Sequence, residues 1–306
     1  MTSGMTAQIV ETSLQQVQQQ LMHVQGELAS GHRINRPSND PIGTENVLQW
    51  QNALDQNTQY RSNAQDAATW LGATQSALQS AVSLAQQVRT LAVSADSGAL
   101  TSQQAQAIAS QIGSLQSSLL NLANTQVTGQ YIFSGQQTGV QPFSAGASGI
   151  AYGGGGGTLQ REVAPGQYVE ATVDGNSAFT PVFQAIGAIL YDLGPGGNPG
   201  NLAANATLSG TNPYNPGPQG DLAQLDAALG GLTAAEGQAG AQLQQTQQAQ
   251  AQLTAAQTAL QELQGNTLNA NMAQSVVQLQ QLQVDYQSAL GAASAVLQKT
   301  LASYVR

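Results

Sequence analysis

The sequence Leu28-Ala-Ser-Gly-His-Arg-Ile-Asn-Arg-Pro-Ser-Asn-Asp-Pro41 separates two long stretches that carry helical patterns. Gly31 suits the left-handed backbone that often ends a helix. Asp40 and Pro41 suit the start of the next helix, because an Asp side chain accepts hydrogen bonds from free amides at the N-cap and proline presets φ at the first helical position. We therefore predict a polar hinge, residues 28–41, between two helices.

The stretch before the hinge has a heptad pattern. Its apolar residues alternate four and three positions apart, at Val10, Leu14, Val17, Leu21, Val24 and Leu28. This spacing is typical of a helix that packs one narrow apolar seam against a partner helix. The remaining positions are mostly Gln, and we place Glu11 and Glu27 among them on the solvent side. The seam fits packing within one chain and packing between chains equally well.

The end of the chain carries a second narrow seam. From about Asn269, one heptad register contains Met272, Val276, Leu279, Tyr286, Leu290, Ala293, Leu297 and Tyr304, with Gln283 and Thr300 as polar interruptions. Because this seam resembles the first in length and width, we predict that the N- and C-terminal helices pair as a coiled coil.

Further helices lie between the two seams. Residues 42–95 contain no proline and keep helical spacing, and a helix of that length would span roughly 80 Å. Thr101 and Gln104 resemble a capping box before a third helix, and helix resumes at Asp221 and continues to Gly265. We therefore predict a mainly α fold with a small β-rich insertion, arranged as an elongated out-and-back helical rod.

The predicted insertion has turn chemistry and short alternating patterns. Tyr131-Ile-Phe133 indicates a strand, and residues 158–163 and 169–173 indicate a hairpin around Ala164-Pro-Gly166. The run Gly153–Gly157 lacks the Lys and Ser/Thr of a phosphate-binding loop, so we interpret it as a flexible surface loop. Residues 179–193 predict a short amphipathic helix, and residues 194–220 a loop.

These patterns define three expected domains. Residues 1–40 with 268–306 form a terminal coiled-coil assembly domain, residues 41–129 with 221–267 a central rod of long helices, and residues 130–220 a β-rich outer insertion.

Composition narrows the classes of function. Only 8% of the 306 residues are charged, where about a quarter is usual, and the net charge is −9. The only basic cluster is Arg33 with Arg36, so we expect no nucleic-acid partner. No apolar run approaches the roughly 18 residues of a membrane span, so we expect no membrane insertion. Residues 1–10 lack the basic and then apolar pattern of a cleaved signal peptide.

Residues that carry chemistry are few. The absence of Cys excludes disulfides, thiolate metal sites and a Cys nucleophile. His32, Asp40 and Glu45 could be imagined as metal ligands, or as a base with an orienting carboxylate. A solvated hinge with helix-capping residues explains them better. We therefore expect no enzyme activity, no cofactor and no metal.

Several stretches together suggest a family. The hinge, the stretch Thr128-Gly-Gln-Tyr-Ile-Phe-Ser-Gly135 with Gln141-Pro-Phe143, and the ending Leu297-Gln-Lys-Thr-Leu-Ala-Ser-Tyr-Val305 resemble the bacterial flagellin superfamily and, within it, the hook–filament junction proteins. Gln87-Val-Arg-Thr-Leu-Ala-Val93 resembles both flagellins and junction proteins. His32, Asn39 and the run of glycines after Tyr152 depart from the family's usual residues.

The resemblance implies a structural adaptor of the bacterial flagellum that joins the hook, through hook-associated protein 1, to the flagellin filament. It implies a ring of copies of the chain, a type III export chaperone, and an extracellular location reached through the flagellar type III apparatus without a cleaved signal peptide. It also implies that the two terminal seams form the assembly contacts, which fits the marginal stability of a short isolated helix. Arg33 and Arg36 are then expected to contact neighbouring subunits or local carboxylates.

Three alternatives remain open. A short flagellin would build the filament itself. A sensory or scaffold coiled coil would not need the β insertion or the paired terminal seams, and an enzyme docked on the flagellum would need a catalytic constellation.

Overall fold

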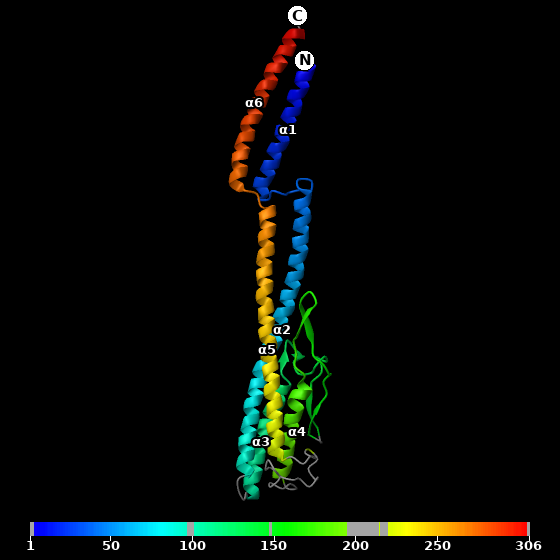
Figure 1. Cartoon of the computed structure of the whole chain (residues 1–306), viewed down its shortest axis with the longest axis vertical. Coiled ribbons are helices and arrows are strands. Elements are labelled where there is room, and N and C mark those ends of the chain that lie inside the picture. The colour runs from blue at the N-terminus through cyan, green and yellow to red at the C-terminus, as the bar shows by residue number, and fades with distance from the viewer. Residues whose placement is uncertain (1–2, 97–100, 147–148, 195–213, 215–219, 305–306) are drawn as a thin grey trace. The chain divides into compact units, whose positions relative to one another are not determined.

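The computed structural model describes residues 3–96, 101–146, 149–194, 214 and 220–304. Over these residues the fold is predominantly α-helical, with three separate pairs of short antiparallel strands (Figure 1). The helices are α1 (Ser3–Ser30), α2 (Pro41–Asp96), α3 (Ser102–Ala123), α4 (Gly175–Leu193), α5 (Asp221–Leu268) and α6 (Met272–Tyr304). The predicted mainly α fold with a small β-rich insertion is confirmed.

The chain packs as two units. We call Met1–Asn57 with Ala255–Arg306 the terminal unit, and Thr58–Thr254 the central unit. The long helices α2 and α5 each contribute one part to the terminal unit and the other to the central unit.

Local sequence signals start two helices of the central unit: α3 begins where the sequence predicts it, and α4 begins four residues before the predicted start at residue 179. Thr101 and Gln104 form a reciprocal capping box before α3: the Gln104 amide donates to Thr101 Oγ1 at 3.3 Å, and the Thr101 amide donates to Gln104 Oε1 at 3.0 Å. Asp174 caps α4 by accepting the Asn176 amide at 3.1 Å. Because each cap satisfies an amide that has no partner inside the helix, the bounds follow from the sequence itself.

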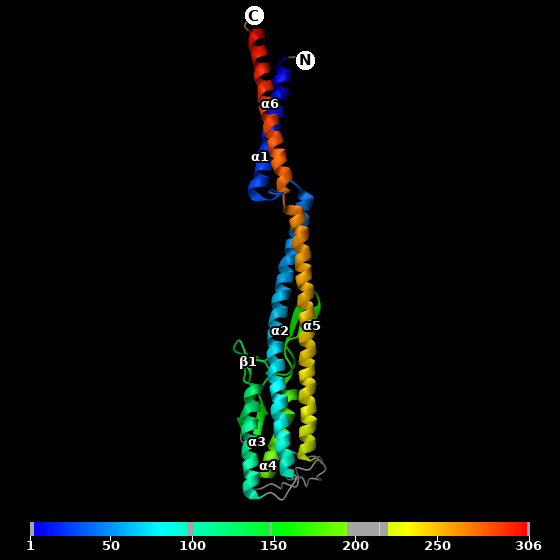
Figure 2. The same ribbon diagram turned by 90° about the vertical axis from the view of Figure 1, so that its left-hand side faces the viewer.

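Two helices run side by side and antiparallel in the central unit (Figure 2). The Arg89 guanidinium on α2 binds the Asp226 carboxylate on α5 through two nitrogens, with Nη2 3.0 Å from Oδ2. Further along, Gln250 Nε2 on α5 donates to Gln65 Oε1 on α2 at 3.3 Å. The two contacts follow in opposite order along the two helices, which fixes their antiparallel direction.

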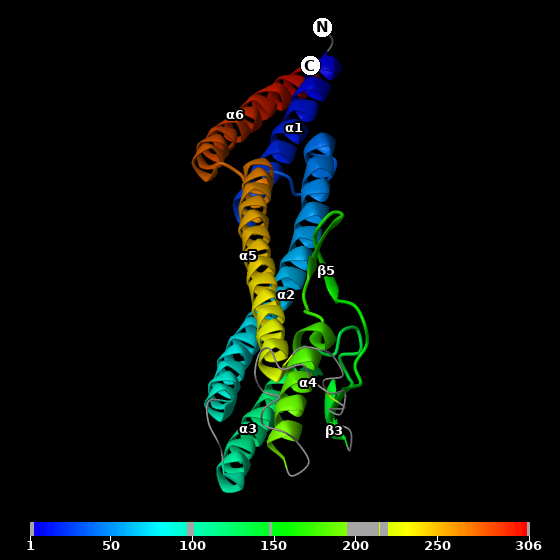
Figure 3. The ribbon, with the colours of Figure 1, turned by 60° about the horizontal axis from the view of Figure 1, so that its bottom comes forward.

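The core of the central unit is fully closed. Helix α4 packs against α3 (Figure 3) and against the strand β4 (Gly149–Tyr152). Phe179 on α4 lies with its ring centroid 4.8 Å from that of Phe133 and 5.8 Å from that of Phe143. Aliphatic side chains with no exposed surface complete this core: Leu78, Ile112, Leu119, Ile132, Ile186, Ile189 and Leu225. Burial on this scale stabilises the unit by the hydrophobic effect.

The strands form three hairpins. They are β1 (Gln126–Val127) with β2 (Gln130–Tyr131), β3 (Phe143–Gly146) with β4 (Gly149–Tyr152), and β5 (Gln160–Ala164) with β6 (Gln167–Glu170). Thr128 and Gly129 both have positive φ, as the two central residues of a type I′ hairpin turn require. The predicted hairpin around residues 164–166 is present as β5 and β6.

The strand predicted for residues 131–133 is shorter in the structure. Strand β2 ends at Tyr131, and Ile132 and Phe133 leave it to become buried in the core. Packing against α4 therefore outweighs the local preference of these residues for a strand.

The predicted loop at Gly153–Gly157 has no helix or strand, and three of its five residues are exposed, but its backbone is hydrogen-bonded to neighbouring segments. The Gly155 amide donates to Ser134 O at 2.9 Å, and Tyr152 Oη donates to Gly155 O at 2.8 Å. Gly135 lies so close to Gly155 O that a β-carbon at Gly135 would collide with it. The glycines thus allow two backbone segments to approach closely. Most of the predicted loop of residues 194–220 lies outside the described residues.

Candidate functional site: the hinge and the terminal helix pair

The hinge adopts the backbone that its sequence predicts. Gly31 has φ +74°, and its amide donates to Glu27 O at 2.8 Å, which ends α1. Asp40 Oδ1 accepts the Gly43 amide at 2.8 Å, and Pro41 is the first residue of α2. These two caps set the length of the hinge between α1 and α2.

A second connection, between α5 and α6, lies against the hinge. The Arg33 amide donates to Leu268 O at 2.6 Å, and the Ala270 amide donates to Gly31 O at 3.0 Å. His32 and Asn269 thereby form an antiparallel bridge. The sequence gives no sign of this pairing, because the two segments are more than two hundred residues apart.

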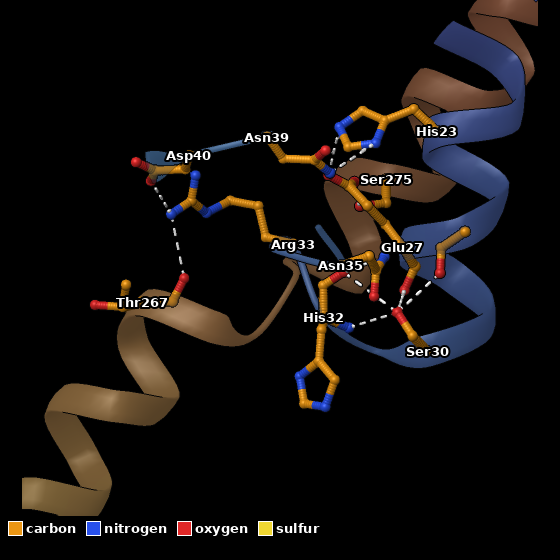
Figure 4. Close-up of polar contacts among 11 residues, drawn as sticks. His23, Glu27, Ser30, His32, Arg33, Asn35, Asn39, Asp40, Thr267 and Ser275 are labelled. Carbon is orange, nitrogen blue, oxygen red and sulfur yellow. Dashed lines mark hydrogen bonds and ion pairs between the residues drawn. The ribbon is translucent and has the colours of Figure 1, made fainter. Parts of the chain in front are cut away.

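Arg33 connects the two helices that leave the hinge region. Its Nη2 atom lies 3.0 Å from Asp40 Oδ2 and donates to Thr267 O at 3.2 Å, in the last turn of α5 (Figure 4). The Gly43 amide and then the Arg33 guanidinium hold the pKa of the Asp40 carboxyl below its ordinary value of 3.8. The expected contact of Arg33 with a local carboxylate is present.

Arg36 differs from Arg33. It is exposed and forms no ion pair among the described residues. It lines an open groove of about 650 Å³ together with Met22, His23, Asn35 and Asn39. The groove therefore combines a cation with the exposed apolar side chain of Met22.

The seam predicted on α1 is the less exposed face of that helix. Between residues 8 and 24, the side chains that are not exposed are those of Val10, Leu14, Val17, Leu21 and Val24. Leu28 is half-buried as well. Helix α6 lies beside α1, and both views place the two chain ends at the same end of the pair (Figures 1 and 2). The two terminal helices therefore pair antiparallel within one chain, as the sequence predicts.

Helix α6 meets α1 with a face that only partly coincides with its predicted seam. Leu279 and Tyr286 are half-buried, whereas Met272, Val276 and Leu290 are 47%, 44% and 45% exposed. The side chains of Leu297 and Tyr304 lie outside the described residues. Between residues 272 and 295, the side chains that are not exposed are those of Ser275, Leu279, Leu282, Tyr286, Ala289 and Ala293.

Glu27 is buried, which corrects its predicted place on the solvent side. It is 9% exposed, and Ser275 Oγ on α6 donates to its Oε2 at 3.3 Å. His23 Nε2 lies 3.4 Å from Glu27 Oε1, and the other ring nitrogen of His23 lies 3.4 Å from Asn39 Nδ2 in the hinge (Figure 4). The overlooked signal was spacing, since Glu27 lies three residues after Val24 on the same face of α1.

The residues considered for catalysis or metal binding do not converge. Asp40 is engaged by Arg33 and by the cap of α2, while His32 and Glu45 are exposed. The part of the chain that the structure describes contains no group of three or more His, Asp or Glu side chains placed to hold a metal ion. Within the same residues, no helix is both long and apolar enough to cross a bilayer.

Comparison with known proteins gives the class of this fold. Residues 2–138, which span α1, the hinge, α2, α3 and the first hairpin, match the family described as the bacterial flagellin N-terminal helical region. This part of the chain is therefore similar to the N-terminal helical region of bacterial flagellins.

The chain is similar in particular to flagellar hook-associated protein 3. It is 33% identical to that protein of Escherichia coli over 119 residues, 39% of this chain and 38% of the relative. The match thus spans well under half the length of the relative. The crystal structure of Bacillus cereus FlgL has a TM-score of 0.56 at 20% identity, over 71% of this chain and 99% of that one. The flagellar junction protein FlgL of Legionella pneumophila has a TM-score of 0.55 at 16% identity, over 75% and 100%. At these identities the two structures bear on the fold alone.

Proposed function

We propose that this chain is a structural adaptor of the bacterial flagellum, which joins the hook, through hook-associated protein 1, to the flagellin filament. The observation that carries the proposal is the similarity to flagellar hook-associated protein 3, at 33% identity over 119 residues. Flagellin and further copies of the chain in a ring are its other partners. The chain works outside the cell, after export by the flagellar type III apparatus with the help of a chaperone and without a cleaved signal peptide.

The terminal helix pair supports an assembly role. Most seam residues of α1 and α6 are only half-buried in the single chain, and Met272, Val276 and Leu290 are exposed. A pair of helices with so much uncovered apolar surface gains free energy when further helices pack on it. We assign the assembly contacts to both predicted seams, in a terminal domain of residues 1–40 and 268–306.

We assign the remaining chain to two further domains. We assign residues 41–129 and 221–267 to a central helical rod and residues 130–220 to an outer insertion. In the hinge, Gly31, Asp40 and Pro41 set the backbone, Arg33 is held within its own chain, and Arg36 is free to meet a carboxylate of a neighbouring subunit. This division of roles needs no catalytic step, so we propose a structural protein rather than an enzyme.

Deletion of the gene tests the adaptor role. Cells without the chain should retain hooks, lack filaments and release unpolymerised flagellin into the medium, because the filament has nothing to attach to. Immunoblotting of the medium and electron microscopy of the hooks measure both results. Retention of filaments on the deletion strain would overturn the proposal.

The competing function, a short flagellin, is tested with purified chain. A filament protein should polymerise into long filaments when seeded, whereas an adaptor should not. Growth of such filaments, followed by light scattering and electron microscopy, would favour the flagellin role over ours.

Substitutions in the seams test the assembly contacts. Leu21→Asp or Leu279→Asp should abolish swimming while the central unit keeps its thermal midpoint, because the charge lies on the seam and outside the central core. Gln20→Asp and Gln280→Asp add the same charge at exposed neighbouring positions and should preserve swimming. An equal loss of swimming in the control variants would contradict the assignment.

A further inference from the structure

Helix α6 carries two overlapping heptad seams. Both contain Leu279, Tyr286 and Ala293, spaced seven residues apart. The first seam adds the residues four positions before each of these, Ser275, Leu282 and Ala289. The second adds the residues three positions before each, Val276, Gln283 and Leu290. A helix turns about 100° per residue, so exchanging one seam for the other rotates α6 by about 50°.

Apolar burial divides between the two seams. The first seam faces α1 and buries Leu282 where the second has the polar Gln283. At the other two levels the first seam has Ser275 and Ala289, where the second has the larger aliphatic side chains of Val276 and Leu290, which are exposed. Burying larger aliphatic side chains is worth more free energy per residue, so these two levels favour the second seam. A polar interaction at one of these levels can therefore decide the rotation.

The buried carboxylate of Glu27 supplies that interaction. Ser275 Oγ donates to Glu27 Oε2 at 3.3 Å, and His23 Nε2 lies 3.4 Å from Oε1 (Figure 4). A rotation of α6 that brought Val276 inward would replace the Ser275 hydroxyl with a side chain that cannot donate. Because a buried carboxylate without its hydrogen bonds is strongly disfavoured, Glu27 penalises the second seam.

We propose that Glu27 is a positioning residue that acts through Ser275 to select which seam of α6 faces α1. It thereby leaves Val276, Leu290 and Met272 on the outer side of the pair. A single buried polar residue that fixes the register of paired helices has this effect in coiled coils. The proposal concerns one chain and does not depend on the flagellar role.

Engineered disulfides can measure the selection, because the chain contains no cysteine. Because α1 and α6 are antiparallel, residues about two turns before Glu27 on α1 face residues about two turns after Ser275 on α6. Leu21 should therefore lie near Leu282. Leu21→Cys with Leu282→Cys reports the first seam, and Leu21→Cys with Gln283→Cys reports the second. Both are measured by the initial rate of disulfide formation in dilute chain, followed by mass spectrometry.

With Glu27 present, the first pair should form its disulfide about tenfold faster than the second, the effect of one hydrogen bond to a charged group. Adding Glu27→Leu should bring the two rates to within about threefold, and Ser275→Ala should act in the same direction. Glu27→Gln retains an acceptor for Ser275 and should keep most of the preference. A general loss of helix pairing changes both rates together, so the ratio separates seam selection from stability.

Three results would overturn the proposal. The first is an equal rate for both pairs with Glu27 present. The second is an unchanged ratio in Glu27→Leu, and the third is a change in Glu27→Gln as large as that in Glu27→Leu, since either would remove the role of the hydrogen bond.

Discussion

The central unit and the terminal unit use apolar residues in opposite ways. In the central unit, α2, α3, α4 and α5 close a core in which side chains from each helix have no exposed surface, such as Leu78, Ile112, Phe179 and Leu225. In the terminal unit, the buried side chains of α1 and α6 among the described residues are those of Val24, Glu27, Ser275 and Leu282, and each keeps some exposed surface. A closed core stabilises a unit by itself, whereas a half-covered seam gains its stability from further partners. The difference supports our proposal that the terminal unit carries the assembly contacts.

The largest expected effect is in the aromatic core of the central unit. Phe179→Ala should lower the free energy of unfolding by about 3–5 kcal/mol, because it removes a fully buried ring that packs on Phe133 and Phe143. Urea unfolding followed by Trp70 fluorescence measures it in a Trp50→Phe background. Tyr168→Ala removes an exposed aromatic ring and should cost less than about 0.5 kcal/mol. An equal loss of unfolding free energy in the two variants would contradict the difference between a closed core and its surface.

A slightly smaller loss is expected where two backbone segments meet in the same unit. Gly135→Ala should cost about 2 kcal/mol or more, since Gly135 has φ +62° and an added β-carbon would collide with Gly155 O. Gly139→Ala is the matched control, because nothing lies within 4 Å of the added carbon. The same urea titration compares them. If Gly135→Ala left the free energy of unfolding unchanged, residues 153–157 would be as flexible as the sequence suggested.

A matched pair on α6 separates folding from assembly in the terminal unit. Leu282→Ala removes a side chain that is 7% exposed and should destabilise the α1 and α6 pair by about 2 kcal/mol, seen as faster amide exchange in both helices. Leu290→Ala should leave amide exchange unchanged in the isolated chain and still impair swimming. If Leu290→Ala loosened the isolated pair as much as Leu282→Ala, the second seam would belong to the fold and not to assembly.

The smallest effect concerns Asp40. Because its pKa is lowered in the folded chain, the stability it contributes is present above the ordinary value of 3.8 and is lost as the pH falls through the lower folded value. Carboxyl NMR should therefore place its midpoint below 3.8. Arg33→Gln should raise the midpoint only in part, since the Gly43 amide is the larger cause of the shift. A complete return to 3.8 in that variant would assign the shift to Arg33 alone.

Sequence reasoning found the elements whose cause is local. The caps at Gly31, Asp40 and Thr101 and the spacing of the α1 seam each depend on residues within one or two helical turns. The same reasoning missed the Arg89 and Asp226 ion pair and the His32 and Asn269 bridge, because their partners are distant in the sequence. It also placed Glu27 in solvent, since charge alone suggested exposure.

The sequence by itself determined the two helix ends at the hinge and the start of α3, that the two terminal helices carry seams, and that the chemistry of the hinge is polar. Those properties follow from backbone preference and apolar spacing, which act over a few residues. Only the tertiary structure decided which of the two seams of α6 faces α1. That choice depends on a carboxylate of one helix and a hydroxyl of another, and a hydrogen bond between distant residues has no signature in the spacing of either helix.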